Sequence, residues 1–214
     1  QRGSLLAEAD AVRAAIFTHC VKKDAADRPY FAWSVDLAGH HDVYDEPPGS
    51  LQLLPYYGFC ERKNVIWQNT VRMIRSADYK FSFAGKPIAE IGCPHAHWPW
   101  VLSFCNSFLC GHAEQALREL TIMPMDNGIA CESVDADTGE CTTGSAFATC
   151  AGFLCHVLPT AAKMGLRPCS AKQYERDSYL QKAQVTISAV FVDKWVRFTY
   201  SRHRSSNASG VRAL

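Results

Sequence analysis

The sequence predicts an all-α domain in which amphipathic helices alternate with long loops. Apolar residues recur at helical spacing over about 4–22, 64–76, 101–120 and 142–158. The connecting segments are rich in Gly, Pro and aromatic residues, and loops this long in a compact domain are usually functional. Helices that carry such loops on one rim would form a helical toroid. The 214 residues, 48% of them apolar, suit one globular domain or part of a larger one.

The composition argues against two classes of partner. A formal net charge of +1 gives no electrostatic reason to bind nucleic acid or a membrane surface. No apolar run approaches the roughly 20 residues that span a bilayer, and the first residues lack the apolar core of a signal peptide. The ten cysteines include no C-x-x-C pair, and several lie in apolar helical patterns. This favours free thiols in a reducing compartment over a disulfide framework, and we expect a cytoplasmic protein.

The first predicted helix covers about residues 4–22, with Ser4 as its N-cap. Its apolar face is formed by residues at spacings of four, three and four: Leu5, Ala9, Val12 and Ile16. Residues 30–37 form an aromatic, partly β-branched run, which fits a strand and a packed loop equally well.

A turn-rich stretch, Tyr44-Asp-Glu-Pro-Pro-Gly-Ser50, comes next, and its prolines and glycine stop any regular element. Ser50 is expected to cap a short helix that ends at Pro55. A helix is predicted over 64–76, and an irregular segment over 78–99.

Residues 101–120 predict one continuous helix. Thr142 or Thr143 is expected to cap the last patterned helix, which runs to about residue 158. Beyond it, residues 184–192 fit a helix or a strand, and the polar residues 201–214 predict a flexible tail.

Glu132 is the main candidate for acid–base chemistry. It lies in a Gly-flanked loop before the last patterned helix, and a loop carboxylate held by a rigid scaffold is a common catalytic group. A solvated surface charge or a capping acceptor explains a loop glutamate as well. Sugar hydrolysis needs two carboxyl groups, one that protonates the leaving oxygen and one that activates water or attacks. The carboxylates available to that chemistry are Glu132, Asp45, Glu46, Asp36, Glu90, Asp126 and Asp135.

Aromatic side chains interleaved with polar groups also suit a sugar site, because their flat faces stack on sugar rings. The candidates are Trp98, Trp100, Tyr44, Tyr56, Tyr57 and Trp33, although ordinary core packing explains any one of them. His95 is a candidate donor to a sugar hydroxyl or partner for a carboxylate.

Two other kinds of enzyme site stay open. Cys93, His95 and His97 lie at i, i+2 and i+4, so they share one side of an extended segment and could ligate zinc. Cys131, next to Glu132, could act as a thiol nucleophile with His95. No fourth zinc ligand is evident from spacing, and nothing in the sequence brings Cys131 and His95 together.

Three blocks of sequence resemble glycoside hydrolase family 125, and they occur in the family's order. The first block contains Val35-Asp36, the acidic pair Asp45-Glu46, the Pro-Gly-Ser-Leu turn and Leu54-Pro-Tyr-Tyr-Gly-Phe59. The second block contains Ile91-Gly-Cys-Pro-His95 and Trp98-Pro-Trp-Val-Leu-Ser103. The third block contains Gly128 to Ser133 and Phe147 to Leu154. Together they cover roughly residues 30–158.

The resemblance implies a metal-independent exo-α-mannosidase with an (α/α)6 barrel, no cofactor and an α-1,6-linked mannoside oligosaccharide as substrate. Glu132 matches the family's general base, which activates water for inversion. Its acid partner should then stand about 6.5–9.5 Å away. Asp45, Glu46 and His95 match positions that line the sugar pocket, and Trp98 and Trp100 are expected to contact the substrate with them.

The chain also departs from the family. The family's acid lies in an Arg-Pro-Ser-Asp-Asp-type motif upstream of the Val-Asp pair, and no such motif precedes Asp36. We therefore expect residues 1–163 to form a partial barrel, its C-terminal half, and 164–214 to form a divergent, partly disordered extension. Cys131 replaces the usual His, and Cys93 replaces the usual Ser. The alternative function is a catalytically incomplete carbohydrate-binding remnant. The sequence leaves the oligomeric state open.

Overall fold

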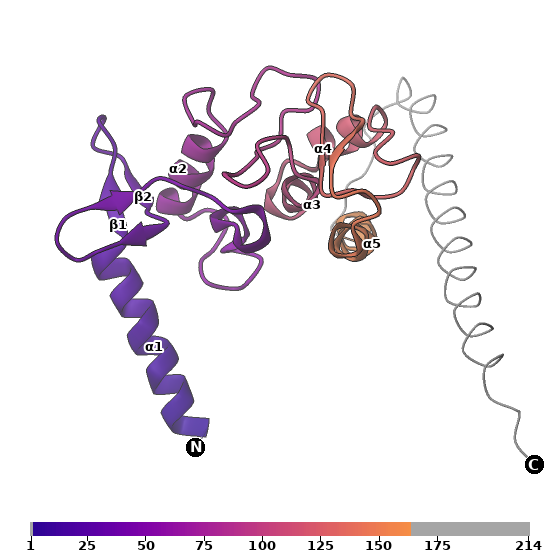
Figure 1. Ribbon diagram of the computed structural model, residues 1–214. Coiled ribbons are helices and arrows are strands. Elements are labelled where there is room, and N and C mark those ends of the chain that lie inside the picture. The colour runs from indigo at the N-terminus through magenta and orange to yellow at the C-terminus, as the bar shows by residue number, and fades with distance from the viewer. Residues whose placement is uncertain (1, 164–214) are drawn as a thin grey trace, which may run out of the picture. The chain divides into compact units, whose positions relative to one another are not determined.

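The computed structural model describes residues 2–163, which belong to the first of the two units, Gln1–Leu166, into which the chain divides. The expectations for 164–214 lie outside the described residues. The helical elements are α1 (Arg2–His19), η1 (Pro47–Gly49), η2 (Leu51–Leu53), α2 (Val65–Ile74), α3 (Val101–Cys110), α4 (Ala113–Leu120) and α5 (Ala148–Lys163) (Figure 1). None of these helices is both long and apolar enough to cross a bilayer.

Three small antiparallel hairpins accompany the helices. They are β1 (Val21–Lys23) with β2 (Pro29–Phe31), β3 (Ser34–Val35) with β4 (His41–Asp42), and β5 (Ser133–Val134) with β6 (Cys141–Thr143). In the last hairpin Ser133 pairs with Thr143, and the register shifts before Val134 pairs with Cys141. The prediction of an all-α domain therefore holds in part, because helices dominate but local hairpins shape the loops.

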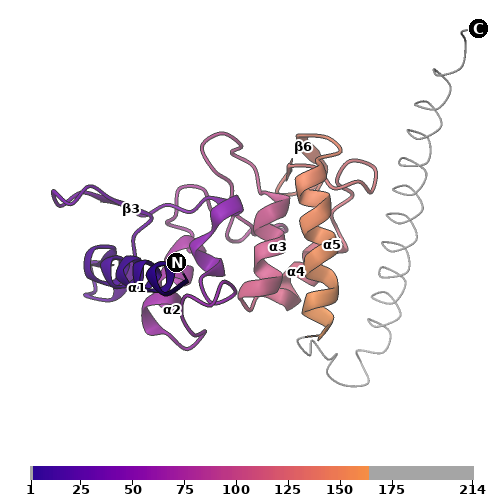
Figure 2. The ribbon, with the colours of Figure 1, turned by 90° about the horizontal axis from the view of Figure 1, so that it is seen from below.

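Helix α3 is the centre of the core. All ten of its residues are buried, and it contacts α4, α5, η1 and η2. Figure 2 shows α3 and α5 side by side. Phe104 and Phe108 pack edge to face, with ring centroids 5.1 Å apart. Because Ser103, Asn106 and Ser107 are also buried on this helix, their polar atoms need partners inside the protein.

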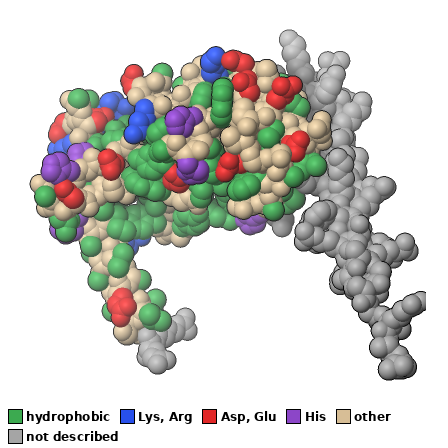
Figure 3. Space-filling view, viewed as in Figure 1, with side chains coloured by type: hydrophobic (Ala, Val, Ile, Leu, Met, Phe, Trp, Pro, Cys, Tyr) green, Lys and Arg blue, Asp and Glu red, His purple; other side chains and the backbone are tan. Residues whose placement is uncertain are grey.

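A second cluster holds the N-terminal elements together. Phe31, Trp67, Val71 and Cys110 are buried there, and Ile16 and Phe17 at the end of α1 pack against them. The part of α1 before Ile16 is different, since Leu5, Leu6 and Val12 are exposed by 66%, 61% and 60%. Figure 3 shows hydrophobic side chains on the surface of this helix. The predicted apolar face is thus covered only at its C-terminal end.

Two side chains among the described residues cap helices, and the sequence predicts one of them, Ser50. The Ser50 side chain accepts a hydrogen bond from the backbone N–H of Gln52, and that of Asn64 accepts one from Trp67. The run at 30–37 contributes β2 and β3, and 78–99 is irregular. The nine cysteines of the described part are free thiols.

Three helix predictions are wrong. Ser4 does not cap the first helix, because α1 begins at Arg2 and Ser4 lies within it. Residues 101–120 form two helices, because Gly111 adopts φ +104° and ends α3 with a left-handed cap, a role for which glycine is favoured. Thr142 and Thr143 do not cap the last helix, since they lie in β6 and α5 begins at Ala148. Their hydroxyls bond to Ser133 instead, at 2.9 and 2.5 Å.

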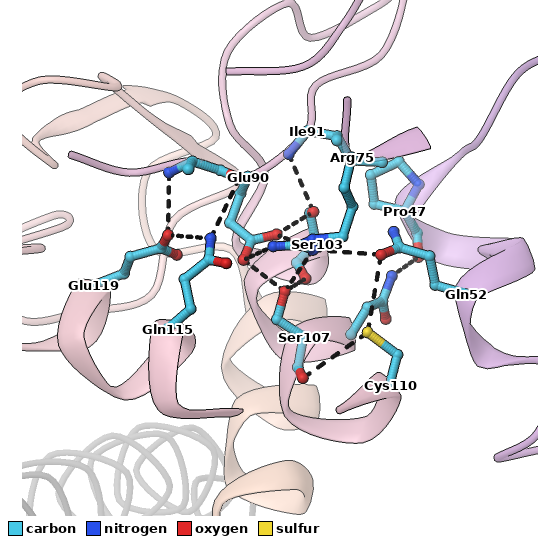
Figure 4. A network of polar contacts seen from close by, with 12 residues as sticks. Pro47, Gln52, Arg75, Glu90, Ile91, Ser103, Ser107, Cys110, Gln115 and Glu119 are labelled. Carbon is cyan, nitrogen blue, oxygen red and sulfur yellow. Dashed lines mark hydrogen bonds and ion pairs between the residues drawn. The ribbon is translucent and has the colours of Figure 1, made fainter. Parts of the chain in front are cut away.

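A buried polar network joins α2, α3 and two loops (Figure 4). Arg75, the C-cap of α2, pairs with both oxygens of Glu90 at 3.4 Å. Glu90 is fully buried and also accepts hydrogen bonds from Ser103 Oγ at 2.6 Å and Ser107 Oγ at 2.5 Å. Arg75 donates further to Gln52 Oε1 at 3.3 Å. A buried carboxylate is tolerated only with this degree of compensation.

Glu119 extends the network from α4. Its Oε1 accepts hydrogen bonds from the Ala89 N–H at 3.0 Å and from Gln115 Nε2 at 2.7 Å. Burial, with a smaller contribution from the nearby Glu90 carboxylate, raises the pKa of Glu119 to about 7. Burial raises the pKa of Asp45 to about 7 as well.

We predict that Arg75→Met lowers the free energy of unfolding by about 3–5 kcal/mol, because it leaves Glu90 buried without its counter-charge. Urea denaturation measures the change. Arg72→Met on the exposed side of the same helix is the matched control, and its weak pair with Asp24 should be worth at most about 1 kcal/mol. Adding Glu90→Gln to Arg75→Met should recover part of the loss. Equal effects of the two arginine substitutions would contradict the network.

We predict a pH-dependent stabilisation by Glu119→Gln. The folded protein holds the Glu119 proton more tightly than the unfolded chain does, so the stability from that proton is fully present below the ordinary pKa of 4.5 and is lost as pH rises through about 7. The glutamine variant keeps a neutral group at every pH. Its free energy of unfolding relative to wild type should therefore rise between these pH values, by up to about 3 kcal/mol. Subtracting the wild-type curve removes the contribution of Asp45. A difference that does not change with pH would refute the assignment.

Candidate functional site

The backbone of Glu132 is fixed between the start of α3 and the β5–β6 hairpin. Its N–H donates to the carbonyl oxygens of Thr143 at 3.2 Å and Gly144 at 3.0 Å, and its carbonyl oxygen accepts from the Val101 N–H at 3.0 Å. The side chain is partly exposed, and its Oε2 accepts a hydrogen bond from Thr143 Oγ1 at 2.7 Å. The carboxylate is therefore oriented by a hydroxyl donor in a residue that is only partly buried.

Gly144 makes this arrangement possible. It adopts φ +57°, and a Cβ at that position would lie 2.5 Å from Glu132 Cβ and 3.3 Å from Glu132 Oε2. Side-chain atoms cannot approach so closely, so only glycine lets the end of β6 close over the glutamate. The sequence predicts Thr142 or Thr143 as a helix cap and does not predict that Thr143 and Gly144 hold Glu132. The β-branched pair Thr142-Thr143 followed by a glycine is the local signal that indicates a strand and a turn here.

A second group of polar side chains comes from two other loops. Glu46 Oε1 lies 3.6 Å from His95 Nδ1, and Cys93 Sγ lies 3.4 Å from the same nitrogen. The Tyr44 hydroxyl donates to Glu46 Oε2. Burial raises the pKa of the Cys93 thiol to about 11, and the Glu46 carboxylate adds to the shift. Burial and the Glu46 carboxylate likewise raise the pKa of Tyr44.

Asp45 faces inward although it adjoins Glu46. It is fully buried, and its carboxylate accepts hydrogen bonds from Ser50 Oγ and the Leu51 N–H, both at 2.7 Å, and from Gln52 Nε2 at 3.3 Å. Asp45 thus organises the loop that presents Glu46. Its direct contact with a sugar stays a prediction.

The two tryptophans of the second loop differ in exposure. Trp98 is 42% exposed, whereas Trp100 is 3% exposed and donates from Nε1 to the Ala96 carbonyl at 3.1 Å. The rings of Trp100 and His95 pack edge to face, with centroids 5.1 Å apart. Trp100 also forms a backbone bridge with Ser133, the residue after Glu132. Trp100 therefore connects the His95 loop to β5, the strand that begins directly after Glu132.

The close turn at 92–97 also depends on a glycine. A Cβ on Gly92 would lie 2.7 Å from the His97 carbonyl oxygen. His97 itself is turned to the Pro94 carbonyl, 2.6 Å from its Nε2, and it does not join the Glu46 and Cys93 side chains. Among the described residues, the group that could hold a metal ion is Glu46, Cys93 and His95. The candidate zinc ligands Cys93, His95 and His97 are therefore corrected, because Glu46 takes the place of His97.

The thiol-nucleophile interpretation loses support. Cys131 is fully buried, and its Sγ donates to the Ser133 carbonyl at 3.2 Å. Burial raises the pKa of this thiol to about 12, so it is protonated at neutral pH and a poor nucleophile.

A profile of the metal-independent alpha-mannosidases, glycoside hydrolase family 125, matches residues 4–158. The chain belongs to this family. The comparison with curated proteins found no match. A Streptococcus pneumoniae protein, solved in a non-productive complex with alpha-1,6-mannobiose during work on a family of metal-independent alpha mannosidases, has a similar fold, with a TM-score of 0.65 and 21% identity. The likeness covers 74% of this chain and 38% of that one, so the chain spans well under half the length of that protein.

We predict that Gly144→Ala destabilises the family 125 chain by clearly more than Gly128→Ala. Both glycines have positive φ, so alanine costs about 1–2 kcal/mol of backbone strain at either position. Only Gly144 adds the contact with Glu132 Cβ, because the space around a Cβ on Gly128 is open. Urea denaturation gives both values. Equal costs would show that the hairpin does not close on Glu132.

Proposed function

We propose that this chain forms the general-base side of an exo-α-mannosidase site that hydrolyses α-1,6-linked mannosides with inversion, as part of an (α/α)6 barrel. The observation that carries the proposal is the setting of Glu132 in a chain of this family. Thr143 donates to Glu132 Oε2, and the side chain is partly exposed, so Oε1 remains able to take a proton from an attacking water.

Glu46, His95 and Trp98 are proposed to contact the sugar. Glu46 and His95 offer a carboxylate and an imidazole 3.6 Å apart, which suits hydrogen bonding to neighbouring hydroxyls. Trp98 is exposed enough to stack on a sugar face. Trp100 supports the His95 ring from the buried side, and Asp45 holds the loop of Glu46. Hydrolysis by two carboxyl groups requires neither a metal nor a cofactor.

The general acid is proposed to come from the family's Arg-Pro-Ser-Asp-Asp-type motif, which this chain does not contain before Asp36. Inversion requires that acid about 6.5–9.5 Å from Glu132, with room for a water between the two groups. The proposed activity is therefore that of the complete barrel. Glu46, His95 and the exposed Trp98 would equally serve a second candidate function, that of a carbohydrate-binding protein without turnover.

Glu132→Gln tests the proposal. Glutamine keeps the size of the side chain and an oxygen that accepts from Thr143, but it cannot take a proton from water. We predict that, in the complete barrel that supplies the general acid, Glu132→Gln lowers the hydrolysis of α-1,6-mannobiose by about 10²–10⁴-fold and leaves the melting temperature unchanged. Product release and calorimetric binding of the disaccharide are measured together.

Glu140→Gln is the matched control and should leave turnover unchanged. Glu140 is exposed and directly precedes β6, the second strand of the same hairpin. Near-normal turnover of Glu132→Gln would remove the general-base assignment. Binding of mannobiose without hydrolysis in the complete barrel would favour the carbohydrate-binding function, and the absence of both binding and hydrolysis there would refute each function.

A further inference from the structure

Three potential metal ligands of different chemistry meet where the Tyr44–Glu46 turn approaches the 93–95 turn. Glu46 Oε1, Cys93 Sγ and a ring nitrogen of His95 all lie within 4.8 Å of one another. Cys93 is fully buried, Glu46 is partly buried and His95 is exposed, so one side of the group is open to solvent. An ion could therefore reach the cluster from the exposed His95 side, whereas Cys93 on the other side is shielded from solvent.

The spacing of these atoms fits the coordination shell of zinc. Tetrahedral bonds of about 2.3 Å to sulfur and about 2.0–2.2 Å to nitrogen and oxygen place neighbouring ligands about 3.4–3.6 Å apart. The structure has Cys93 Sγ at 3.4 Å and Glu46 Oε1 at 3.6 Å from His95 Nδ1. An ion at the centre would require shifts of only a few tenths of an ångström along these two edges.

The polar atoms of the cluster lack full compensation within the described residues. Glu46 Oε1 is shielded from solvent and accepts no hydrogen bond there. His95 Nδ1, 3.6 Å from this oxygen, is a positive partner only when the imidazole is protonated. With a neutral imidazole, a buried carboxylate oxygen beside a buried thiol is costly. A cation would supply that partner for Glu46 Oε1, and the Cys93 proton would pass to bulk solvent as sulfur bonds to the metal.

Neighbouring contacts hold the ligands in place. The Tyr44 hydroxyl donates to Glu46 Oε2, which leaves Oε1 for the metal. Trp100 packs against the His95 ring, and the Cys93 N–H donates to the Ala96 carbonyl at 2.9 Å, closing the turn between Cys93 and His95. Such supporting contacts orient metal ligands in known sites.

We propose that Glu46 Oε1, Cys93 Sγ and His95 Nδ1 bind a soft divalent cation, Zn²⁺, with water in the fourth position. A thiolate, an imidazole and a carboxylate together suit zinc or cobalt better than magnesium or calcium. Glu46 and His95 are also the proposed sugar contacts. The consequence that bound zinc excludes the mannoside rests on the proposed function, whereas zinc binding itself does not.

Cobalt titration of the full 214-residue chain tests the site, since Co²⁺ adopts the zinc geometry and a cobalt–thiolate bond gives a charge-transfer band. One equivalent of Co²⁺ should produce the band, and Zn²⁺ should displace it. Cys93→Ser should abolish the band, with Cys93→Ala as a second variant if the first folds poorly. Glu46→Gln and His95→Gln should weaken cobalt binding by at least the ~10–100-fold typical of residues that only support a ligand.

Two substitutions are matched controls. Cys155→Ser removes an exposed thiol on α5, and His97→Gln removes the histidine of the same loop that faces Pro94. Both should leave the band and the cobalt affinity unchanged, with circular dichroism confirming the fold of every variant. The proposed ligand set would be overturned if wild type gave no band or if Cys155→Ser lost the band. It would also be overturned if His97→Gln lost the band while Glu46→Gln kept it.

Competition with α-1,6-mannobiose separates this site from the proposed function. If mannobiose binds, saturating Zn²⁺ should weaken its binding at least tenfold in wild type and leave it unchanged in Cys93→Ser. A cobalt band at Cys93 in a chain that binds no mannobiose would support the metal site and count against the proposed function. Mannobiose binding without any cobalt band would support the proposed function and count against the metal site.

Discussion

The buried ion pair between Arg75 and Glu90 is the interaction on which the arrangement of the candidate site depends. Arg75 ends α2 and reaches Gln52, in the loop organised by Asp45, while Glu90 begins the segment that leads to Cys93 and His95. Both charged groups are tied to the serines of α3. Because an uncompensated buried charge costs several kcal/mol, alternative positions of these loops that separate the pair are strongly disfavoured. The pair therefore contributes specificity of arrangement more than net stability.

Helix α3 is the common support for the parts of the site. Its residues Ser103 and Ser107 bond to the Arg75–Glu90 pair. The N–H of its first residue, Val101, donates to the Glu132 carbonyl. Trp100, just before the helix, contacts His95 through its ring and Ser133 through its backbone. A helix buried on every side cannot shift without opening the core, so it is a rigid base for side chains that must be positioned to a fraction of an ångström.

The site combines residues that suit two ligands with opposite demands. A sugar needs neutral hydrogen-bond donors, acceptors and a flat aromatic face, whereas a cation needs a convergent set of electron-pair donors. Glu46 and His95 can bind either ligand, whereas the buried thiol of Cys93 favours a soft cation. In a family described as metal-independent, such an ion would have no catalytic task, and its effect would be to occupy the place of substrate.

The sequence by itself determined the local features of this protein and the order of its motifs. These are the cap Ser50, the irregular segment 78–99, the loop position of Glu132, and the succession of motifs that places the chain in its family. Periodicity and capping are encoded within a few residues, so they can be predicted without a fold. Only the tertiary structure decided that Gly111 breaks a helix, that Asp45 turns inward while Glu46 turns toward His95, and that Thr143 and Gly144 hold Glu132. These outcomes depend on burial and on contacts between residues far apart in the chain, as with Arg75 and Glu90, which lie 15 positions apart. A local pattern carries no information about which distant group will compensate a buried charge or leave room for a side chain.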